Sequence, residues 1–157
     1  MTLTKLGNPD AEPGEELEVF PGTKGTKVTL KCTEFTCRCP VTNQPDWATI
    51  VVHYVAQWKI VESKSVKLFL ETYRDKGVFH EHLVWELLDV FVEALDPLSC
   101  TVSVKFNSRG GIAITAQASY KRPKEEAFLS VGRLRLGPDL VEHCCPMSDA
   151  VTGGSDV

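Results

Sequence analysis

The period of the hydrophobic pattern changes twice along the chain, and this order limits the possible folds more than any other feature. Apolar and polar residues alternate over 28–33 and again over 49–54, as expected of two half-buried strands. The alternation returns over 101–106 and 112–119. The glycines in the turn Arg109-Gly110-Gly111 lie between these two segments, and the combination is typical of a β-hairpin.

The middle of the chain has a helical period instead. Over 65–75 and over 81–95, apolar side chains recur every three or four residues on one face. Gly77 is expected to stop the first helix, and Asp96-Pro97 the second, because a residue before proline disfavours the helical region. The order of two strands, two helices and two strands predicts an α+β fold, a four-stranded antiparallel sheet covered on one face by two antiparallel helices.

The composition suits one domain. With 157 residues, 43% of them hydrophobic, the chain can bury one sizeable core, which we place over 27–120. Residues 1–26, rich in glycine, proline and acidic side chains, are predicted to form a flexible leader. Residues 121–157, which end in a glycine-rich run, are predicted to form a C-terminal extension that is partly disordered.

Charge and cysteine content narrow the class of protein. A formal net charge of −4 argues against direct nucleic-acid binding, which relies on a basic face. No apolar run has the length of a signal peptide or a membrane span, so we expect a soluble cytoplasmic protein. The six cysteines are crowded, as in Cys37 with Cys39 and Cys144 with Cys145, which favours free thiols in a reducing compartment.

A loop stiffened by Pro40 and Pro45 brings a thiol and a carboxyl group together. The prolines fix two backbone dihedrals, and Asn43 tolerates the left-handed conformation of a tight turn, so Cys39 and Asp46 are expected to converge. A thiolate is a good nucleophile, and a nearby carboxyl group could protonate whatever it attacks. The alternative is a buried structural cysteine beside a turn aspartate.

The helix starts carry two further patterns. Residues 62–67, Glu-Ser-Lys-Ser-Val-Lys, place two lysines where a helix N-terminus already favours an anion such as phosphate; the alternative is an ordinary capped and solvated helix end. His80 and His82 offer metal ligands, but positions i and i+2 do not share a helix face. We therefore expect no metal there.

Four motifs taken together resemble the NADPH-dependent 7-cyano-7-deazaguanine reductases, the nitrile reductases of queuosine biosynthesis and tRNA modification. The motifs are Cys-Pro to Gln-Pro-Asp over 39–46, Glu-Ser-Lys-Ser to Lys over 62–67, Phe-His-Glu over 79–81 and Arg-Gly-Gly-Ile over 109–112. The resemblance covers residues 35–115 and implies the tunnelling fold, ββααββ. It also implies edge-to-edge association into a homo-oligomer, a decamer of two stacked pentamers, with active sites between subunits.

The resemblance implies a role for each motif. Cys39 is the nucleophile that forms a covalent thioimidate with the nitrile carbon, and Asp46 protonates the nitrile nitrogen. NADPH then supplies two hydrides in succession, which gives the primary amine, 7-aminomethyl-7-deazaguanine. Glu81 anchors the deazaguanine ring through paired hydrogen bonds.

The remaining positions follow from the same resemblance. The substrate pocket is completed by Val61, Glu62, Ser63 and His80, and the basic positions near the dinucleotide phosphates are Lys64, Lys67 and Arg109. No Gly-x-Gly-x-x-Gly motif occurs, so the cofactor is not expected to bind in the Rossmann manner. Leu83 stands where many relatives have a second cysteine that pairs with the nucleophile, which puts a protective disulfide in doubt.

Two other functions remain open. A related enzyme of the same fold adds ammonia to the nitrile and lacks the Glu-Ser-Lys-Ser type of motif, which this chain has. The other is a zinc-stapled interaction module without catalytic activity. Its ligands would be Cys37, Cys39, His143 and Cys144 or Cys145.

Overall fold

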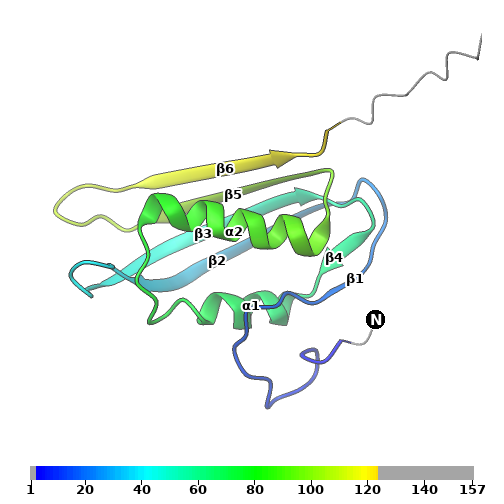
Figure 1. Cartoon of the computed structure of the whole chain (residues 1–157), viewed down its shortest axis with the longest axis horizontal. Helices are drawn as coiled ribbons and strands as arrows, with labels where there is room; N and C mark the ends of the chain where they lie inside the picture. Colours follow the sequence, from blue (N-terminus) through cyan, green and yellow to red (C-terminus); the bar gives the residue numbers. More distant parts are fainter. Residues whose placement is uncertain (1–2, 124–157) are drawn as a thin grey trace, which may run out of the picture. The chain divides into compact units, whose positions relative to one another are not determined.

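The fold is built on a four-stranded antiparallel sheet in the order β2-β3-β5-β6 (Figure 1). The structure is a computed structural model that describes residues 3–123. The strands are β2 (Lys27–Arg38), β3 (Pro45–Val55), β5 (Ser99–Phe106) and β6 (Thr115–Lys121). The sequence-predicted α+β order of two strands, two helices and two strands is confirmed.

Two helices lie on one face of this sheet, α1 (Ser63–Glu71) and α2 (His80–Leu95) (Figure 1). The second ends where it was predicted, with Asp96 in the left-handed conformation before Pro97. The first ends four residues earlier than expected. After Glu71 the chain continues in tighter turns with i to i−3 hydrogen bonds. Tyr73 is still buried in these turns, so the apolar pattern in the sequence continues beyond the end of the helix.

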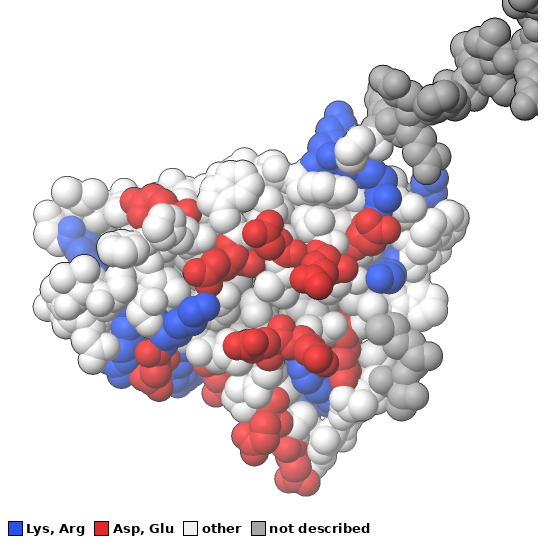
Figure 2. Space-filling view, viewed as in Figure 1, with Lys and Arg blue, Asp and Glu red and all other residues white. Residues whose placement is uncertain are grey.

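The core lies between the helices and the sheet. The inward-facing residues alternate along β3 and β5, and they pack against the apolar stripe of α2. The largest fully buried apolar side chains are Tyr54, Phe91, Phe106, Ile50, Leu83, Leu87, Leu95, Val102 and Val104. The outward face of α2 is acidic (Figure 2), with Asp89 and Glu93 exposed on it, which disfavours contact between this helix and a polyanion.

A second, two-stranded ribbon pairs β1 (Val19–Pro21) with β4 (Lys59–Val61). β1 lies inside the segment predicted to be a flexible leader, and three residues are too few to show an alternating pattern in the sequence. Further contacts join this segment to itself and to α1: the Glu18 carboxylate accepts hydrogen bonds from the amides of Thr4 and Lys5, and the Glu18 amide donates to Ser65 Oγ at 3.0 Å.

Among the described residues, no helix is long and apolar enough to span a membrane. Most of the predicted C-terminal extension, including His143, Cys144 and Cys145, lies outside the described residues.

Candidate active site

The β2–β3 hairpin places Cys39 and Asp46 on opposite sides of one short loop. In the register of the hairpin, Asp46 on β3 pairs with Cys37 on β2. Cys39 comes two residues after Cys37, just beyond the end of β2. The loop is closed by hydrogen bonds from Cys39 N to Gln44 O and from Asn43 N to Cys39 O, each 2.9 Å long. Asn43 has φ 56°, the left-handed conformation that the sequence allowed for. The hairpin thus holds the thiol and the carboxyl group at the end of the sheet.

The segment that leads into α2 packs against this loop. Arg38 N donates to Lys76 O and Val78 N donates to Arg38 O, both at 3.0 Å. Gly77 lies between them, and a Cβ on it would be 3.0 Å from Pro40 Cα. Only glycine allows this approach without a shift of the loop. The prediction that Gly77 stops the first helix was wrong, because α1 ends at Glu71 with Thr72 as its C-cap, and Gly77 instead allows this close packing.

Asp46 is buried, with 2% of its surface exposed, and each of its carboxyl oxygens has one side-chain neighbour. Its Oδ1 accepts a 2.6 Å hydrogen bond from Arg109 Nη1, and its Oδ2 lies 3.2 Å from His80 Nε2. The His80 ring is stacked on Phe106, with the centroids 3.6 Å apart. A buried carboxyl group with these partners is held in one orientation and can exchange a proton without moving.

The Cys39 sulfur is stabilised as a thiolate. Hydrogen bonds from the Thr42 hydroxyl, from the backbone amides of Thr42 and Val41, and from Arg109 lower the pKa of Cys39 from 9.0 to about 7. Burial has the opposite effect on the neighbouring thiol and raises the pKa of Cys37 to about 11. Cys39 is therefore the thiol that is ionised near neutral pH, as a nucleophile requires.

The first turn of α2 completes this end of the molecule. His80 opens the helix after the N-cap residue Phe79, and Glu81 follows with an exposed side chain. Because the Glu81 side chain is exposed, its carboxylate is accessible to a ligand. Leu83, one turn further on, is fully buried in the core.

The start of α1 forms a second group of candidate residues. Glu62 is the N-cap, and its buried carboxylate accepts hydrogen bonds from Lys64 N at 2.8 Å and from Ser65 N at 2.6 Å. These amides, which the sequence suggested for a phosphate, already bind the chain's own carboxylate. Lys64 Nζ donates to the carbonyl oxygen of Asn8. Any anion at this helix start must therefore be held by side chains.

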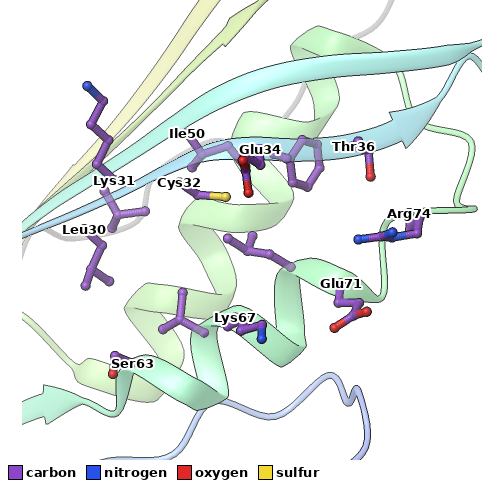
Figure 3. Close-up of a pocket in the computed structure, with 14 residues that line it drawn as sticks. Leu30, Lys31, Cys32, Glu34, Thr36, Ile50, Ser63, Lys67, Glu71 and Arg74 are labelled. Carbon is purple, nitrogen blue, oxygen red and sulfur yellow. The ribbon is translucent and has the colours of Figure 1, made fainter.

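A groove of about 380 Å³ lies between α1 and the edge strand β2 (Figure 3). Its walls are mainly apolar, and Ser63 and Lys67 line it from α1. Arg74 adds a further cationic group, against the acidic Glu34 and Glu71, whereas the Lys31 ammonium group points away from α1 (Figure 3). The exposed Lys67 ammonium group therefore borders an open space that could hold part of a ligand.

One chain does not bring all the predicted site residues together. One group lies beside the β2–β3 and β5–β6 turns and the start of α2 (Figure 1), and it consists of Cys39, Asp46, His80, Glu81 and Arg109. The other surrounds the start of α1 and consists of Val61, Glu62, Ser63, Lys64 and Lys67.

The two groups are separated along α1. The Arg38–Asp75 ion pair, 2.8 Å long, joins the chain that follows α1 to the end of β2, beside the β2–β3 loop. The helix itself has nine residues and a length of about 14 Å at 1.5 Å per residue, which keeps its start away from that loop. Arg109 thus lies apart from Lys64 and Lys67, with which the sequence analysis grouped it.

Two residues that contact the site, Thr42 and Gln44, could not be identified from the sequence. Thr42 and Gln44 lie within the proline-stiffened loop, and the Gln44 side chain accepts a 3.1 Å hydrogen bond from Arg109 Nη2. Their place in the loop could have suggested a supporting role, but neither residue type identifies one. Within the described residues, no cluster of three or more His, Cys, Asp or Glu side chains could hold a metal ion, and Cys32, Cys37, Cys39 and Cys100 are free thiols.

Known proteins with similar sequences share this region. The family model described as QueF-like protein matches residues 45–125. A NADPH-dependent 7-cyano-7-deazaguanine reductase of Frankia casuarinae is 51% identical over 123 residues, which are 78% of this chain and 98% of that protein. Proteins of the same name from Syntrophus aciditrophicus and Thermomicrobium roseum are 46% and 43% identical, over 77% and 82% of this chain and 88% and 98% of theirs.

A solved structure has the same fold. The apo form of the archaeosine synthase QueF-Like superposes with a TM-score of 0.59 and 23% sequence identity, and the match covers 64% of this chain and 99% of that one. At this identity the likeness concerns the fold alone.

Proposed function

This chain belongs to the family of the NADPH-dependent 7-cyano-7-deazaguanine reductases, and we propose that it catalyses the reaction named for its relatives. The reaction is the four-electron reduction of the nitrile of 7-cyano-7-deazaguanine to the aminomethyl group, in queuosine tRNA modification in the cytoplasm. The observation that carries this proposal is the Cys39 thiol with a lowered pKa beside the buried Asp46 carboxyl group.

The first step is addition of Cys39 to the nitrile. The thiolate gives an electron pair to the nitrile carbon, one π pair of the C≡N bond moves to nitrogen, and that nitrogen takes the proton of the Asp46 carboxyl group. The product is a thioimidate on Cys39 and a carboxylate at Asp46. A pKa of Cys39 near 7 supports this step, because about half of the sulfur is then ionised at neutral pH.

Asp46 and His80 are proposed to transfer the protons of the reaction. Asp46 is buried, and bulk water cannot readily replace the proton that it gives up. His80 Nε2, 3.2 Å from the carboxylate, is suitably placed to return one, and the stack on Phe106 fixes the imidazole ring for that transfer.

The substrate ring is proposed to bind to Glu81. Its exposed carboxylate can accept two hydrogen bonds, from the ring N–H and the exocyclic amine of a guanine-like edge. Val61, Ser63 and His80 are proposed to complete the pocket. Glu62 is proposed to act indirectly, because its carboxylate is already used to cap α1 and so fixes the positions of Ser63 and Lys64.

NADPH supplies the two hydrides when it is bound. Lys64 and Lys67 are proposed to hold its phosphates, because Lys67 is exposed beside an open groove large enough for part of a ligand. Because the amides at the start of α1 are capped by Glu62, cationic side chains take over the task that amides perform in a Rossmann fold.

A homo-oligomer is proposed because one chain separates the two groups of site residues. The nucleophile and its proton donor lie at one end of α1, and Lys64 and Ser63 lie at the other. β2 and β6 are the two edges of the sheet and can pair with neighbouring copies, which would place residues of a second chain beside each group. A decamer of two stacked pentamers is the assembly that we propose, with no direct nucleic-acid partner.

The reaction is tested by following NADPH absorbance at 340 nm with 7-cyano-7-deazaguanine and by measuring the amine formed. We expect two NADPH consumed per amine, and no turnover in Cys39→Ala or Asp46→Asn. Absence of NADPH oxidation by the wild-type protein contradicts the proposal. Product formed from ammonia without NADPH would favour nitrile amidation instead.

A further inference from the structure

Arg109 contacts both groups that exchange charge in the nitrile-addition step. We propose that Arg109 is a catalytic residue of this step, in which its guanidinium group stabilises the negative charge as it passes from the Cys39 sulfur to the Asp46 carboxylate. This inference rests on the proposed function and assigns to Arg109 a task other than binding the dinucleotide phosphates.

The guanidinium group is held by the catalytic loop. Nη1 donates to Asp46 Oδ1 at 2.6 Å and Nη2 donates to Gln44 Oε1 at 3.1 Å, and the group also lies close enough to Cys39 to hydrogen-bond its sulfur. The backbone carbonyl oxygen of Gln44 accepts a hydrogen bond from the Cys39 amide. One planar cation thus joins the nucleophile, the acid and the backbone that connects them.

The turn that carries Arg109 is suited to hold it in place. Arg109 N donates to Ile112 O at 2.9 Å and Ile112 N donates back to Arg109 O at 3.0 Å. Gly110 and Gly111 have φ 56° and 82°, conformations that glycine adopts without strain. A closed tight turn presents the arginine with little freedom of the backbone, which lowers the cost of holding the guanidinium group in one position.

The charge balance explains what a cation does there. In the proposed mechanism, Cys39 enters the step as the thiolate and Asp46 enters it as the carboxylic acid. The C–S bond forms, the proton moves from Asp46 to the nitrile nitrogen, and the carboxylate now carries the charge. The net charge of the pair stays at −1 throughout. A cation in contact with both ends therefore stabilises the charge during its transfer without having to move.

The other charged and titratable groups cannot substitute for Arg109. From β2, Cys37 faces the pair with a raised pKa and is neutral. From α2, His80 contacts Asp46 through Nε2. The Arg38 guanidinium group, also from β2, donates to Asp75 and to the carbonyl oxygen of Asn43. Among the described residues, Arg109 is thus the cation that reaches both Cys39 and Asp46.

Single-turnover kinetics without NADPH test this role. Arg109→Gln and Arg109→Lys are mixed with saturating 7-cyano-7-deazaguanine, and the rate of adduct formation is followed by intact mass and near-ultraviolet absorbance. We expect the rate of adduct formation to fall about tenfold or more in Arg109→Gln. In Arg109→Lys, which keeps the positive charge but not the planar guanidinium group, we expect a rate between those of Arg109→Gln and the wild type. The Kd for NADPH, measured by fluorescence titration, is expected to change by less than about twofold in both.

Arg122→Gln is the matched control, because Arg122 directly follows β6, at the end of that strand away from the β5–β6 turn, and pairs with Asp96. Its adduct rate is expected to equal that of the wild type. An unchanged adduct rate in Arg109→Gln with a Kd for NADPH raised about tenfold would overturn the inference and assign Arg109 to the cofactor. If Arg109→Gln fails to fold, an Arg109→Lys rate equal to wild type with weaker NADPH binding has the same consequence. A wild-type protein that forms no adduct refutes the proposed function, and the inference with it.

Discussion

The hydroxyl group of Thr42 is the largest single cause of the lowered pKa of Cys39, so its removal gives a quantitative test of how the site makes a nucleophile. At a pKa of about 7, about half of the Cys39 sulfur is thiolate at pH 7. At the ordinary value of 9.0, only about 1% is. The donors around the sulfur together therefore raise the thiolate fraction by about fiftyfold at this pH.

Thr42→Val removes the hydroxyl and keeps the shape of the side chain. The amides of Val41 and Thr42 and the Arg109 guanidinium remain, so we expect a pKa between the two limits and an alkylation rate about fivefold lower at pH 7. The hydroxyl group donates a hydrogen bond to the negatively charged thiolate and stabilises it. Its loss therefore raises the pKa of Cys39 and shifts the profile of alkylation rate against pH to higher pH. Above pH 9 the rates of variant and wild type are expected to converge.

The assay is alkylation by iodoacetamide between pH 5 and 10, with the modified cysteine located by peptide mass spectrometry. Cys37 and Cys100 are buried with raised pKa values and are expected to react slowly, and the peptide masses separate the Cys39 signal from that of the remaining cysteines. Thr42→Ser keeps the hydroxyl and is the control, with the wild-type profile expected. A Thr42→Val profile identical to that of the wild type would refute the reasoning.

Three further variants test other parts of the site. Glu81→Gln is expected to raise the KM for the cyano substrate at least tenfold, because a hydrogen bond to a charged acceptor is worth about 1.5–3 kcal/mol, while alkylation of Cys39 is unchanged; an unaltered KM counts against Glu81 as the anchor. Lys67→Ala is expected to raise the KM for NADPH severalfold and to leave adduct formation intact, and abolished adduct formation would contradict its assignment to the cofactor. Gly77→Ala is expected to slow adduct formation and to lower the Tm, because its methyl group would displace Pro40; a variant with wild-type rate and Tm would show that the loop tolerates the shift.

The sequence predicted most of the main sheet and both helices because these elements are long and periodic. The second helix shows this most clearly: its apolar stripe and the Asp96-Pro97 stop agree with its observed end at Leu95. β1 and β4 have three residues each, too short for any periodicity, so no strand was predicted there. The end of α1 was overextended because Tyr73 stays buried after the helix has become a series of tighter turns.

For the site, the local relations could be predicted and the distant ones could not. Cys39 and Asp46 were paired because one short, stiff loop joins them. The contact between Asp46 and Arg109 spans 63 residues and exists only because the β5–β6 turn lies beside the β2–β3 loop at one end of the sheet. Likewise, the pattern at the start of α1 suited an anion, but it could not show that the side chain of Glu62 folds back onto the helix amides.

The most direct test of the account is the intact mass of the protein after mixing with 7-cyano-7-deazaguanine in the absence of NADPH. The account predicts an increase equal to one substrate molecule per subunit, located on Cys39, absent in Cys39→Ala and lost again when NADPH is added. An unshifted mass in a protein that still consumes NADPH with this substrate, or an adduct on a different cysteine, would contradict it.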